Sequence, residues 1–324
     1  MLSFILRRGL QSLFVMLAVS LIAFSLFRFI GDPVAQMVGQ ETSIEDQENI
    51  RERLGLNDPI VTQYARFVGK LSRGDFGYSY RTRQPVSEMI VSRLPATLEL
   101  GAVSLIISLL IGIPAGIYTA LKRGFLSNAL LVVTLVGISI PTFVIGVFLI
   151  YLFGVSLGWL PTFGRGDTTH IGWWQTNFLT ISGLKALLLP GITLGVYQLT
   201  LTMRLVRAEM QDVLKTDYIR FAAARGINYR SLYFNHAFRN TLVPVVTIVG
   251  LQLGGIIAFS IVTESVFQWP GMGLLFLDSI RYVDIPVMSV YLVLIAFMFV
   301  VINLIVDLLY FVIDPRVRHE ASHD

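Results

Sequence analysis

The sequence contains no cysteine, which excludes disulfides, thiolate nucleophiles and cysteine-ligated metal sites. It also has little charge: Asp, Glu, Lys and Arg make up 14% of the residues, whereas a soluble globular domain carries about 25%. Hydrophobic residues fill 54% of the 324 positions, and the mean hydropathy is +0.70. The composition therefore predicts an integral membrane protein.

Sequence motifs for reaction chemistry are missing too. There is no Gly-x-x-x-x-Gly-Lys-Ser/Thr loop for nucleotide phosphates and no His-Glu-x-x-His zinc motif. The four histidines all lie in predicted loops or near the C-terminus: His170, His236, His319 and His323. Ser139 therefore has no histidine base at membrane depth, as an intramembrane serine protease would need, and we interpret it as a packing residue before a kink at Pro141. We predict no catalytic, cofactor-binding or metal-binding residue and no enzymatic activity.

The apolar segments are long enough to cross a membrane. A spanning helix needs about 20 apolar residues, because the hydrocarbon core is about 30 Å thick and a helix rises about 1.5 Å per residue. Six segments qualify: roughly 9–30, 97–121, 128–157, 184–203, 243–263 and 288–313. The fourth is interrupted by Pro190, Gly191 and Gly195. The first has no small-residue cleavage site after it, so we expect a retained helix rather than a signal peptide.

The expected fold class is therefore an all-α, polytopic membrane protein with six transmembrane helices. Lysine and arginine gather on one side of the predicted spans: Arg7, Arg8, Lys122, Arg123, Arg204, Arg207, Lys215, Arg220, Arg225, Arg230, Arg239, Arg316 and Arg318. The other side has Arg165, Lys185 and Arg281 in its two short loops. This distribution predicts that both termini are cytoplasmic and that, in a bacterium, segment 31–95 faces the periplasm.

Segment 31–95 is expected to contain small helices that cap the membrane domain. Apolar residues recur there at helical spacing: Leu54, Ile60, Tyr64, Phe67, Val68 and Leu71. Asn57-Asp58-Pro59 is typical of a turn that opens a second helix, with proline allowed in its first turn. Contact with an extracytoplasmic partner is compatible with this interpretation.

A basic loop at 204–242 separates two of the apolar segments. Within it, apolar residues recur at helical spacing: Val213, Leu214, Tyr218, Phe221 and Ala222. Thr216 or Asp217 can cap a short helix, and Gly226 stands where a helix ends in a left-handed residue. The small side chains of residues 222–224 suit docking into a groove of another protein. The alternative is an amphipathic helix that lies on the lipid surface.

The loop resembles the "EAA" loop of binding-protein-dependent ABC importer permeases. Arg220 and Phe221 stand where the general motif has Glu-Ala, but the dipeptide/oligopeptide branch typically reads Asp-Tyr-(Ile/Val)-Arg-x-Ala-x-Ala-Lys-Gly. The residues here that fit this branch are Asp217, Tyr218, Ile219, Arg220, Ala222, Ala224 and Gly226, with Arg225 in place of Lys, followed by His236, Ala237, Arg239, Asn240 and Pro244.

The resemblance extends over nearly the whole chain in family order. Further matching motifs are the opening residues to Arg8, Gly31-Asp32-Pro33, Leu54 to Pro59, Gly74 to Gly77, Pro95 to Leu100, Ser139-x-Pro141-x-Phe143, Thr263-Glu264 to Gly273, Asp284-x-Pro286, and Asn303 to Arg316. The long external segment and the N-terminal double arginine resemble the B-type permease subunit rather than its C-type partner.

The resemblance implies a type I importer permease with divided labour. A homologous C-type permease would complete the pore, two ATPase subunits would bind ATP and Mg²⁺, and a periplasmic binding protein would deliver peptides. The chain itself would bind no cofactor and no nucleic acid, and would sit among lipids in the bacterial inner membrane. The residues that would couple to the ATPases are Asp217, Tyr218, Arg220, Phe221, Ala222, Ala224, Arg225 and Gly226. Closure of the ATPases would move this helix and turn the pore from inward-facing to outward-facing.

Three parts follow from this resemblance: residues 1–96, the first helix with the periplasmic segment; residues 97–315, the permease core with a coupling helix at about 213–227; and residues 316–324, a cytoplasmic tail. The cargo stays open, because members of the family also carry nickel, glutathione or oligosaccharides and the binding protein does most of the selecting.

Polar residues in the apolar segments are further candidates. Asn303 and Asp307 are four residues apart on one helix face, and we expect an interhelical hydrogen bond there. Glu99 and Glu264 lie near the outer ends of their helices, where they can gate the periplasmic mouth or simply reach water. Pro270, Gly271 and Gly273 are structural candidates on that same side.

Two other classes of membrane protein remain as alternatives. A secondary transporter predicts a coupling-ion carboxylate near the middle of the bilayer and internal repeats, and we find neither in the sequence. A membrane scaffold predicts no ATP-dependent transport. Copurification with P-loop ATPases distinguishes both from an ABC permease.

Overall fold

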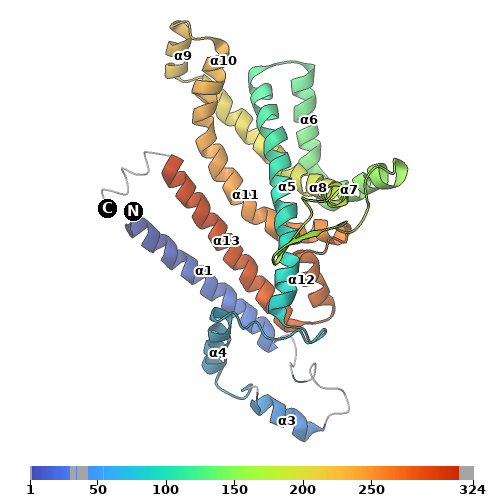
Figure 1. Cartoon of the computed structure of the whole chain (residues 1–324). Coiled ribbons are helices and arrows are strands. Elements are labelled where there is room, and N and C mark those ends of the chain that lie inside the picture. Colours follow the sequence, from blue (N-terminus) through green and yellow to red (C-terminus); the bar gives the residue numbers. More distant parts are fainter. Residues whose placement is uncertain (1, 30–33, 35–42, 54, 314–324) are drawn as a thin grey trace.

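The computed structural model describes residues 2–29, 34, 43–53 and 55–313, which form an elongated bundle of long helices (Figure 1). Several positions of the sequence analysis lie outside the described residues: Gly31 to Pro33, Leu54, Asp314 to Arg316, Arg318, His319, His323 and the tail 316–324. The described part is mostly helical, as the sequence predicts.

The elements follow one another along the chain with short connections. The first are α1 (Leu2–Phe29), α3 (Ile44–Arg53), α4 (Ile60–Ser72), α5 (Val86–Leu121), α6 (Phe125–Ser139) and α7 (Thr142–Leu149). A π-helix, η1 (Ile150–Ser156), and a hairpin of β1 (Thr169–Ile171) and β2 (Trp174–Thr176) come next. The rest are α8 (Ile181–Leu214), α9 (Asp217–Ala224), α10 (Tyr229–Ser231), η2 (Leu232–Ala237, a second π-helix), α11 (Phe238–Val266), α12 (Met272–Arg281) and α13 (Ile285–Ile313).

The predicted spans are present with one change. Within the described residues, five helices are long and apolar enough to cross a membrane: Arg7–Leu26, Val86–Leu121, Ile181–Leu214, Pro244–Val266 and Ile285–Leu308. The third predicted span, 128–157, is not one straight helix, because its halves α6 and α7–η1 meet at 109°. Counted as one broken span, they bring the total to six.

Pro141 explains the break in the third span. Proline has no N–H to donate to the preceding turn and disfavours a helical conformation in the residue before it. Ile140 is accordingly extended, with φ −91° and ψ 127°, and Pro141 begins α7. The sequence predicts a kink here, but not that α7 and η1 would project sideways from the bundle (Figure 1).

Pro190, Gly191 and Gly195 of the fourth span leave α8 continuous. Gly191 and Gly195 lie against α5, where an added Cβ would be 2.7 Å from Val103 Cγ1 and 3.0 Å from the Ser104 carbonyl oxygen. Glycine is therefore required here for the close approach of two helices, a common device in membranes. On the facing helix, small buried residues recur every fourth position: Ser104, Ser108, Gly112 and Gly116. We refer to these positions of α5, together with Gly191 and Gly195, as the small-residue seam.

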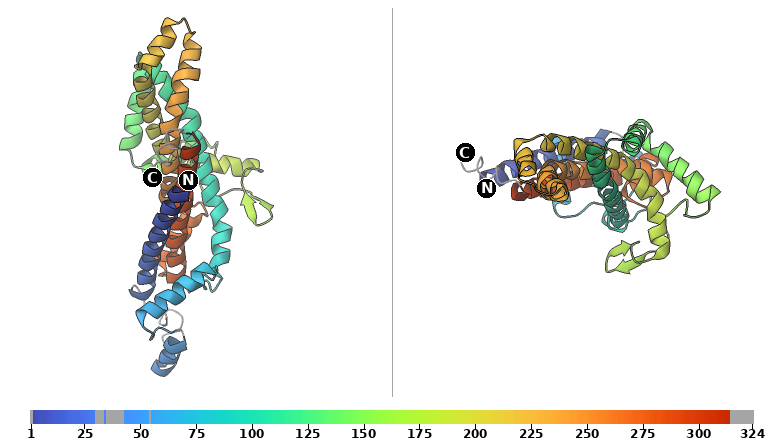
Figure 2. Two further views of the ribbon diagram at one scale, coloured as in Figure 1. Left: turned by 90° about the vertical axis from the view of Figure 1, so that its left-hand side faces the viewer. Right: turned by 90° about the horizontal axis from the view of Figure 1, so that it is seen from above.

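Helices α5, α8 and α11 pack together as the core of the bundle, α13 packs on α11, and α1 packs on α13. Helices α4 and α12 lie at one end, and α9 and α10 lie at the other (Figure 1). The hairpin, which the sequence analysis did not predict, protrudes to one side of the bundle (Figure 2).

Candidate functional site

The predicted coupling helix is the short helix α9, at one tip of the bundle. Thr216 is extended ahead of it, with φ −68° and ψ 150°. Gly226 follows its last turn with φ +79° and no atom within 4 Å of the place a Cβ would occupy. Glycine is thus favoured by its left-handed backbone and not by crowding. The glycine signal places the end of this helix correctly. The predicted start at about residue 213 is too early, because α8 continues to Leu214, and the Thr216 hydroxyl donates to the Val213 carbonyl oxygen and does not cap α9.

Helix α9 buries one face against its own chain. Ile219 and Ala222 are 3% and 8% exposed and join a buried cluster that includes Val206, Met210 and Leu232. The expectation that residues 222–224 together offer a small surface to another protein is therefore wrong for Ala222, which faces inward. Ala222 follows Ile219 by three residues, so the two side chains lie on the same face of the helix.

The opposite face of α9 is open. Phe221 is 63% exposed and Tyr218 is 43% exposed, and Arg225 stacks over the Phe221 ring at 5.2 Å. Asp217 and Arg220 form an exposed ion pair at 3.4 Å. Ala224 is also exposed. This face combines aromatic rings with arginine side chains, two residue types that are enriched at protein–protein interfaces.

Tyr218 fastens the start of α9 to the start of α11. Its hydroxyl accepts a hydrogen bond from Asn240 Nδ2 and lies 3.5 Å from the His236 carbonyl oxygen, to which it donates. The two halves of the sequence pattern, Asp217 to Gly226 and His236 to Asn240, therefore meet in space. These hydrogen bonds link α9 to the start of the long helix α11.

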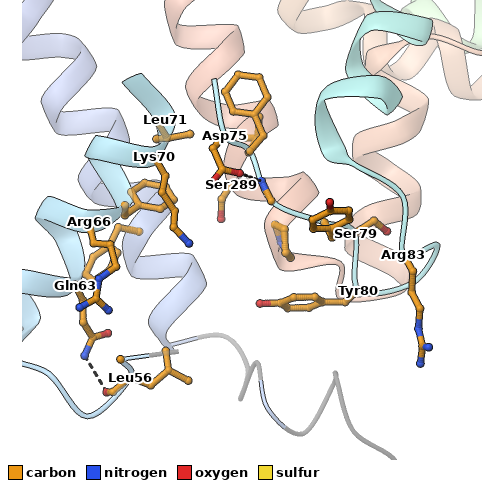
Figure 3. A pocket seen from close by; sticks show the side chains of 18 residues that line it. Leu56, Gln63, Arg66, Lys70, Leu71, Asp75, Ser79, Tyr80, Arg83 and Ser289 are labelled. Atoms are coloured by element: carbon orange, nitrogen blue, oxygen red, sulfur yellow. Dashed lines mark hydrogen bonds between the residues drawn. The ribbon is translucent and has the colours of Figure 1, made fainter. Parts of the chain in front are cut away.

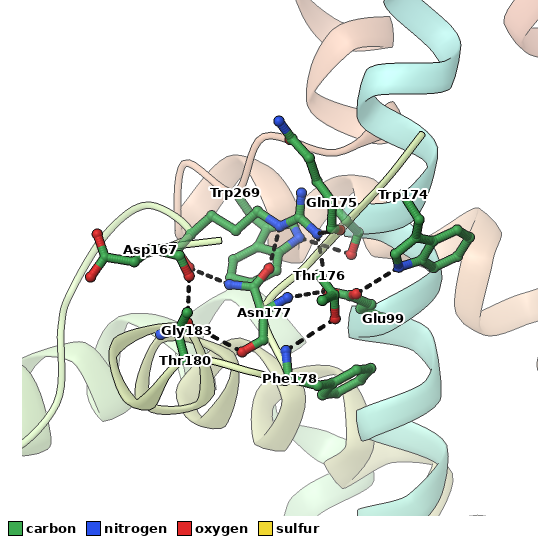
Figure 4. Close-up of polar contacts among 12 residues, drawn as sticks. Glu99, Asp167, Trp174, Gln175, Thr176, Asn177, Phe178, Thr180, Gly183 and Trp269 are labelled. Atoms are coloured by element: carbon green, nitrogen blue, oxygen red, sulfur yellow. Dashed lines mark hydrogen bonds and ion pairs between the residues drawn. The ribbon is translucent and has the colours of Figure 1, made fainter. Parts of the chain in front are cut away.

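A cluster of buried polar groups, which we call the Glu99 clasp, lies away from α9 where α5 meets the hairpin loop (Figure 4). Glu99 is 2% exposed. Its Oε2 accepts hydrogen bonds from Arg165 Nη2 at 3.0 Å and from the Asn177 backbone N–H at 3.1 Å. Its Oε1 accepts one from Trp174 Nε1 at 2.9 Å. The carboxylate thus joins the hairpin to a membrane helix.

Arg165 makes two further side-chain hydrogen bonds within the same clasp. It donates to the Gln175 carbonyl oxygen at 2.6 Å and to Asn177 Oδ1, while Asn177 Nδ2 donates back to the Arg165 carbonyl oxygen. Its side chain is 7% exposed. A buried ion pair needs such extra hydrogen bonds to offset desolvation. The sequence analysis placed Arg165 in an external loop but did not pair it with Glu99.

Glu264 is also buried, at 0% exposure. It accepts hydrogen bonds from Thr97 Oγ1 at 2.7 Å, from Ser260 Oγ at 3.1 Å and from the Leu274 N–H at 3.0 Å. The last contact places the carboxylate at the positive N-terminal end of α12, which stabilises its charge. The interpretation that Glu99 and Glu264 reach water is therefore wrong, because both are enclosed by other elements.

The turn around Glu264 explains the Pro270-Gly271-x-Gly273 pattern. An added Cβ at Gly271 would be 2.4 Å from Glu264 Oε2, and one at Gly273 would be 2.6 Å from the Ile261 Cα. The two glycines thus make room for the carboxylate and for close helix contact. Beside them, Trp269 Nε1 donates to the Ala96 carbonyl oxygen at 3.0 Å.

Asp307 forms the interhelical contact that the sequence predicts. Its Oδ1 accepts a hydrogen bond from Arg8 Nη2 at 2.9 Å, joining α13 to α1. Asn303 lines the same cleft between these two helices. The partner was not foreseen, since 299 residues separate Arg8 from Asp307.

The described residues contain no group of three or more His, Asp or Glu side chains placed to hold a metal ion. Their arrangement is that of a helical membrane bundle with a short, half-exposed helix at one end and buried polar joints elsewhere. These features are those of a polytopic membrane protein.

Comparison with known proteins gives the family. Residues 112–319 match the family described as "Binding-protein-dependent transport system inner membrane component", and residues 1–101 match the family of its N-terminal region. The chain belongs to this family. It is a multi-pass permease of the inner membrane and is not catalytic. The family places it in an ABC transporter complex with ATPases, which bind the ATP, and a binding protein.

Several relatives are similar over their whole length. The chain is 37% identical to the dipeptide transport system permease protein DppB of Alkalihalophilus pseudofirmus, covering 98% of this chain and 100% of the relative. It is 39% identical to the di/tripeptide permease protein DppB of Pseudomonas aeruginosa, covering 99% and 100%. It is 36% identical to the glutathione permease protein GsiC of Escherichia coli strain K12, again covering 99% and 100%.

A solved structure shares the fold. The MetNI methionine ABC transporter in an inward-facing conformation superposes with a TM-score of 0.53 and 19% identity, over 68% of this chain and 93% of that chain.

Proposed function

We propose that this chain forms half of a pore through which an ABC importer moves dipeptides and oligopeptides. The observation that carries the proposal is the 37–39% identity, over 98–99% of the chain, to permeases whose names specify dipeptides, tripeptides or oligopeptides. The glutathione relative supports the same class of cargo, because glutathione is itself a modified tripeptide. Short peptides are therefore the cargo class that this proposal assigns, ahead of nickel and oligosaccharides.

In this proposal the exposed face of α9 docks into an ATPase. Asp217, Tyr218, Arg220, Phe221, Ala224, Arg225 and Gly226 supply the contact, and Ala222 anchors the helix from its buried side. Movement of the ATPases passes through the Tyr218–Asn240 hydrogen bond into α11. Helix α11 packs on α5 and α8. A change in the position of α9 would therefore shift the pore between its inward-facing and outward-facing conformations.

The other half of the pore is a homologous C-type permease, and two ATPase subunits serve the pair. Large apolar side chains on α6 and α7 support a partner or lipid contact: Val132, Val133, Leu135, Val147 and Phe148 are 55–65% exposed.

The division of the chain into residues 1–96, 97–315 and 316–324 also belongs to this proposal. Its first boundary falls inside the continuous helix α5.

The isolated chain is expected to transport nothing. It provides only one half of the pore, and polar groups left facing lipid cost several kcal/mol each. Reconstituted alone in liposomes, it should give no ATP hydrolysis and no uptake of a labelled dipeptide. Both activities should appear when the partner permease, the ATPases and the binding protein are added. Concentrative uptake by the chain alone would revive the secondary-transporter alternative.

We further propose that the α9 end faces the cytoplasm, together with both termini. Basic residues gather on that side, and short cytoplasmic loops are rich in Lys and Arg. Arg220, Arg225 and Arg230 are all exposed there. Helices α3 and α4, on the opposite end, then lie in the periplasm.

Cysteine labelling tests this orientation directly, because the native chain has no cysteine. We expect Arg230→Cys to be protected from a membrane-impermeant thiol reagent in spheroplasts and to react only after permeabilisation. Glu45→Cys, on an exposed position of α3, should react without permeabilisation. The reverse pattern would place α9 outside the cell and exclude its docking to an ATPase.

A further inference from the structure

A cavity of about 540 Å³ lies between α4, the loop over residues 75–83 and the start of α13 (Figure 3). It is remote from α9 and from the Glu99 clasp. Its walls are mainly apolar and include Phe24, Phe67, Phe76 and Val290. Its charged lining groups are Arg66, Lys70, Asp75 and Arg83. The proposed transport mechanism uses none of these residues.

The cavity lies at the boundary between the apolar layer and water. Phe24 is in the last turn of the apolar span Arg7–Leu26, and Ser289 is in the first turns of the span Ile285–Leu308. Helix α4 is fixed at this level, since Tyr64 and Ser20 share a hydrogen bond of 2.7 Å and the Phe24 ring packs on Tyr64 at 5.6 Å. From the ends of these apolar spans we infer that the cavity lies at the depth of lipid headgroups.

Two exposed residues of opposite charge, Lys70 and Asp75, line the mouth of the cavity and form no ion pair with each other. Lys70 extends from α4 into the space between the walls, and Asp75 lies on the wall beside Ser289 (Figure 3). No ion pair joins Lys70 to Asp75, both of which the structure describes. Arg66 is paired with Asp58 at 2.6 Å, and Arg83 points away from the group (Figure 3).

A neutral donor completes the lining. Burial, together with the nearby Asp284 carboxylate, raises the pKa of Tyr80 above its usual range. Its hydroxyl therefore keeps its proton at physiological pH. Asp75 accepts the Gly77 N–H at 3.2 Å through Oδ1. The cavity thus offers one cation, one carboxylate and apolar surface at headgroup depth.

We propose that this cavity binds the headgroup of a zwitterionic aminophospholipid, with its phosphate on Lys70 and its primary ammonium on Asp75. The glycerol and the first part of an acyl chain lie against Phe24, Phe67 and Phe76. A phosphodiester accepts charge-assisted hydrogen bonds from an ammonium group, and basic pockets between membrane helices bind lipid headgroups. The ammonium distinguishes this ligand from a purely anionic lipid and from inorganic phosphate. The proposal is independent of the cargo.

Native mass spectrometry of the whole transporter tests the site. The complex is extracted from nanodiscs made of equal phosphatidylethanolamine and phosphatidylglycerol, and the lipids it retains are counted. We expect wild type to keep phosphatidylethanolamine, and Lys70→Gln and Asp75→Asn each to lower this retention about tenfold or more, as loss of a charge-assisted hydrogen bond predicts. Lys70→Arg should keep it.

Matched controls come from nearby charges outside the cavity. Arg73→Gln removes a cation at the end of α4, and Glu88→Gln removes a carboxylate from an exposed position of α5; both should retain the lipid like wild type. Equal retention of phosphatidylglycerol, or an Asp75→Asn variant that retains as wild type does, would overturn the proposal. So would displacement of the lipid by millimolar inorganic phosphate, which indicates a simple anion site, or by a dipeptide, which indicates a peptide site.

Discussion

Gly226→Asp is expected to abolish most ATP-dependent uptake while the chain still assembles in the membrane at nearly normal amounts. The substituted residue must adopt the left-handed backbone of Gly226, φ +79°, at about 1–2 kcal/mol. The space around the missing Cβ is open, so the fold of the permease itself accommodates the side chain. If α9 docks into an ATPase as proposed, the larger effect arises at that contact, because the new charge would be buried there without a partner.

Gly226→Asn is the matched control for this experiment. Asparagine has nearly the same shape as aspartate, carries no charge, and tolerates the left-handed conformation well. We expect it to keep most of the uptake, whereas an unpaired buried charge costs about 1–3 kcal/mol or more, equivalent to about a tenfold to hundredfold loss. Uptake and stimulated ATPase activity are measured in proteoliposomes containing the full complex. Normal activity of the aspartate variant would exclude a tight contact at this position.

The second large effect is expected at the Glu99 clasp. Glu99→Gln leaves the guanidinium of Arg165, 7% exposed, without its carboxylate. Removing one partner of a buried ion pair costs about 3–5 kcal/mol, so the hairpin loop should detach from α5. Limited proteolysis of the assembled transporter should then cut the loop over residues 157–180 faster than it does in wild type.

Removal of both charges of the Glu99–Arg165 pair serves as a control for the single substitution. The double variant Glu99→Gln with Arg165→Met removes both charges, so part of the lost protection should return. Glu88→Gln makes the same chemical change at an exposed position of the same helix and should leave the cleavage pattern unaltered. If all three variants are cleaved like wild type, the ion pair does not hold the hairpin.

The features predicted correctly from the sequence are those with local causes. Apolar runs identify the spans, because each needs only its own length and composition. Helix α9 was found from Asp217 and Gly226, since the capping and termination signals lie within a few residues of the helix. The kink at Pro141 was foreseen for the same reason. Its angle of 109° was not, because it depends on how α7 packs against other helices.

The features that the sequence did not predict depend on distant pairs. Glu99 and Arg165 are 66 positions apart, and no periodicity within either segment indicates that they meet. The hairpin escaped prediction because its strands have three residues each, too few for a two-residue alternation to be recognised. The inward direction of Ala222 was missed because the three alanines were treated as one surface, although Ala222 alone among them is three residues from Ile219 and shares its buried face.

The small-residue seam limits how the bundle can change shape. An added Cβ at Gly112 would be 3.1 Å from the Leu199 carbonyl oxygen, and one at Gly116 would be 2.7 Å from Val206 Cβ. With backbones this close, α5 and α8 have no layer of flexible side chains between them that could repack as they slide. We therefore expect the pair to move as one rigid body. Opening or closing of the pathway would then come from a tilt of this rigid pair against the neighbouring helices, which is a hinge motion and not a shear.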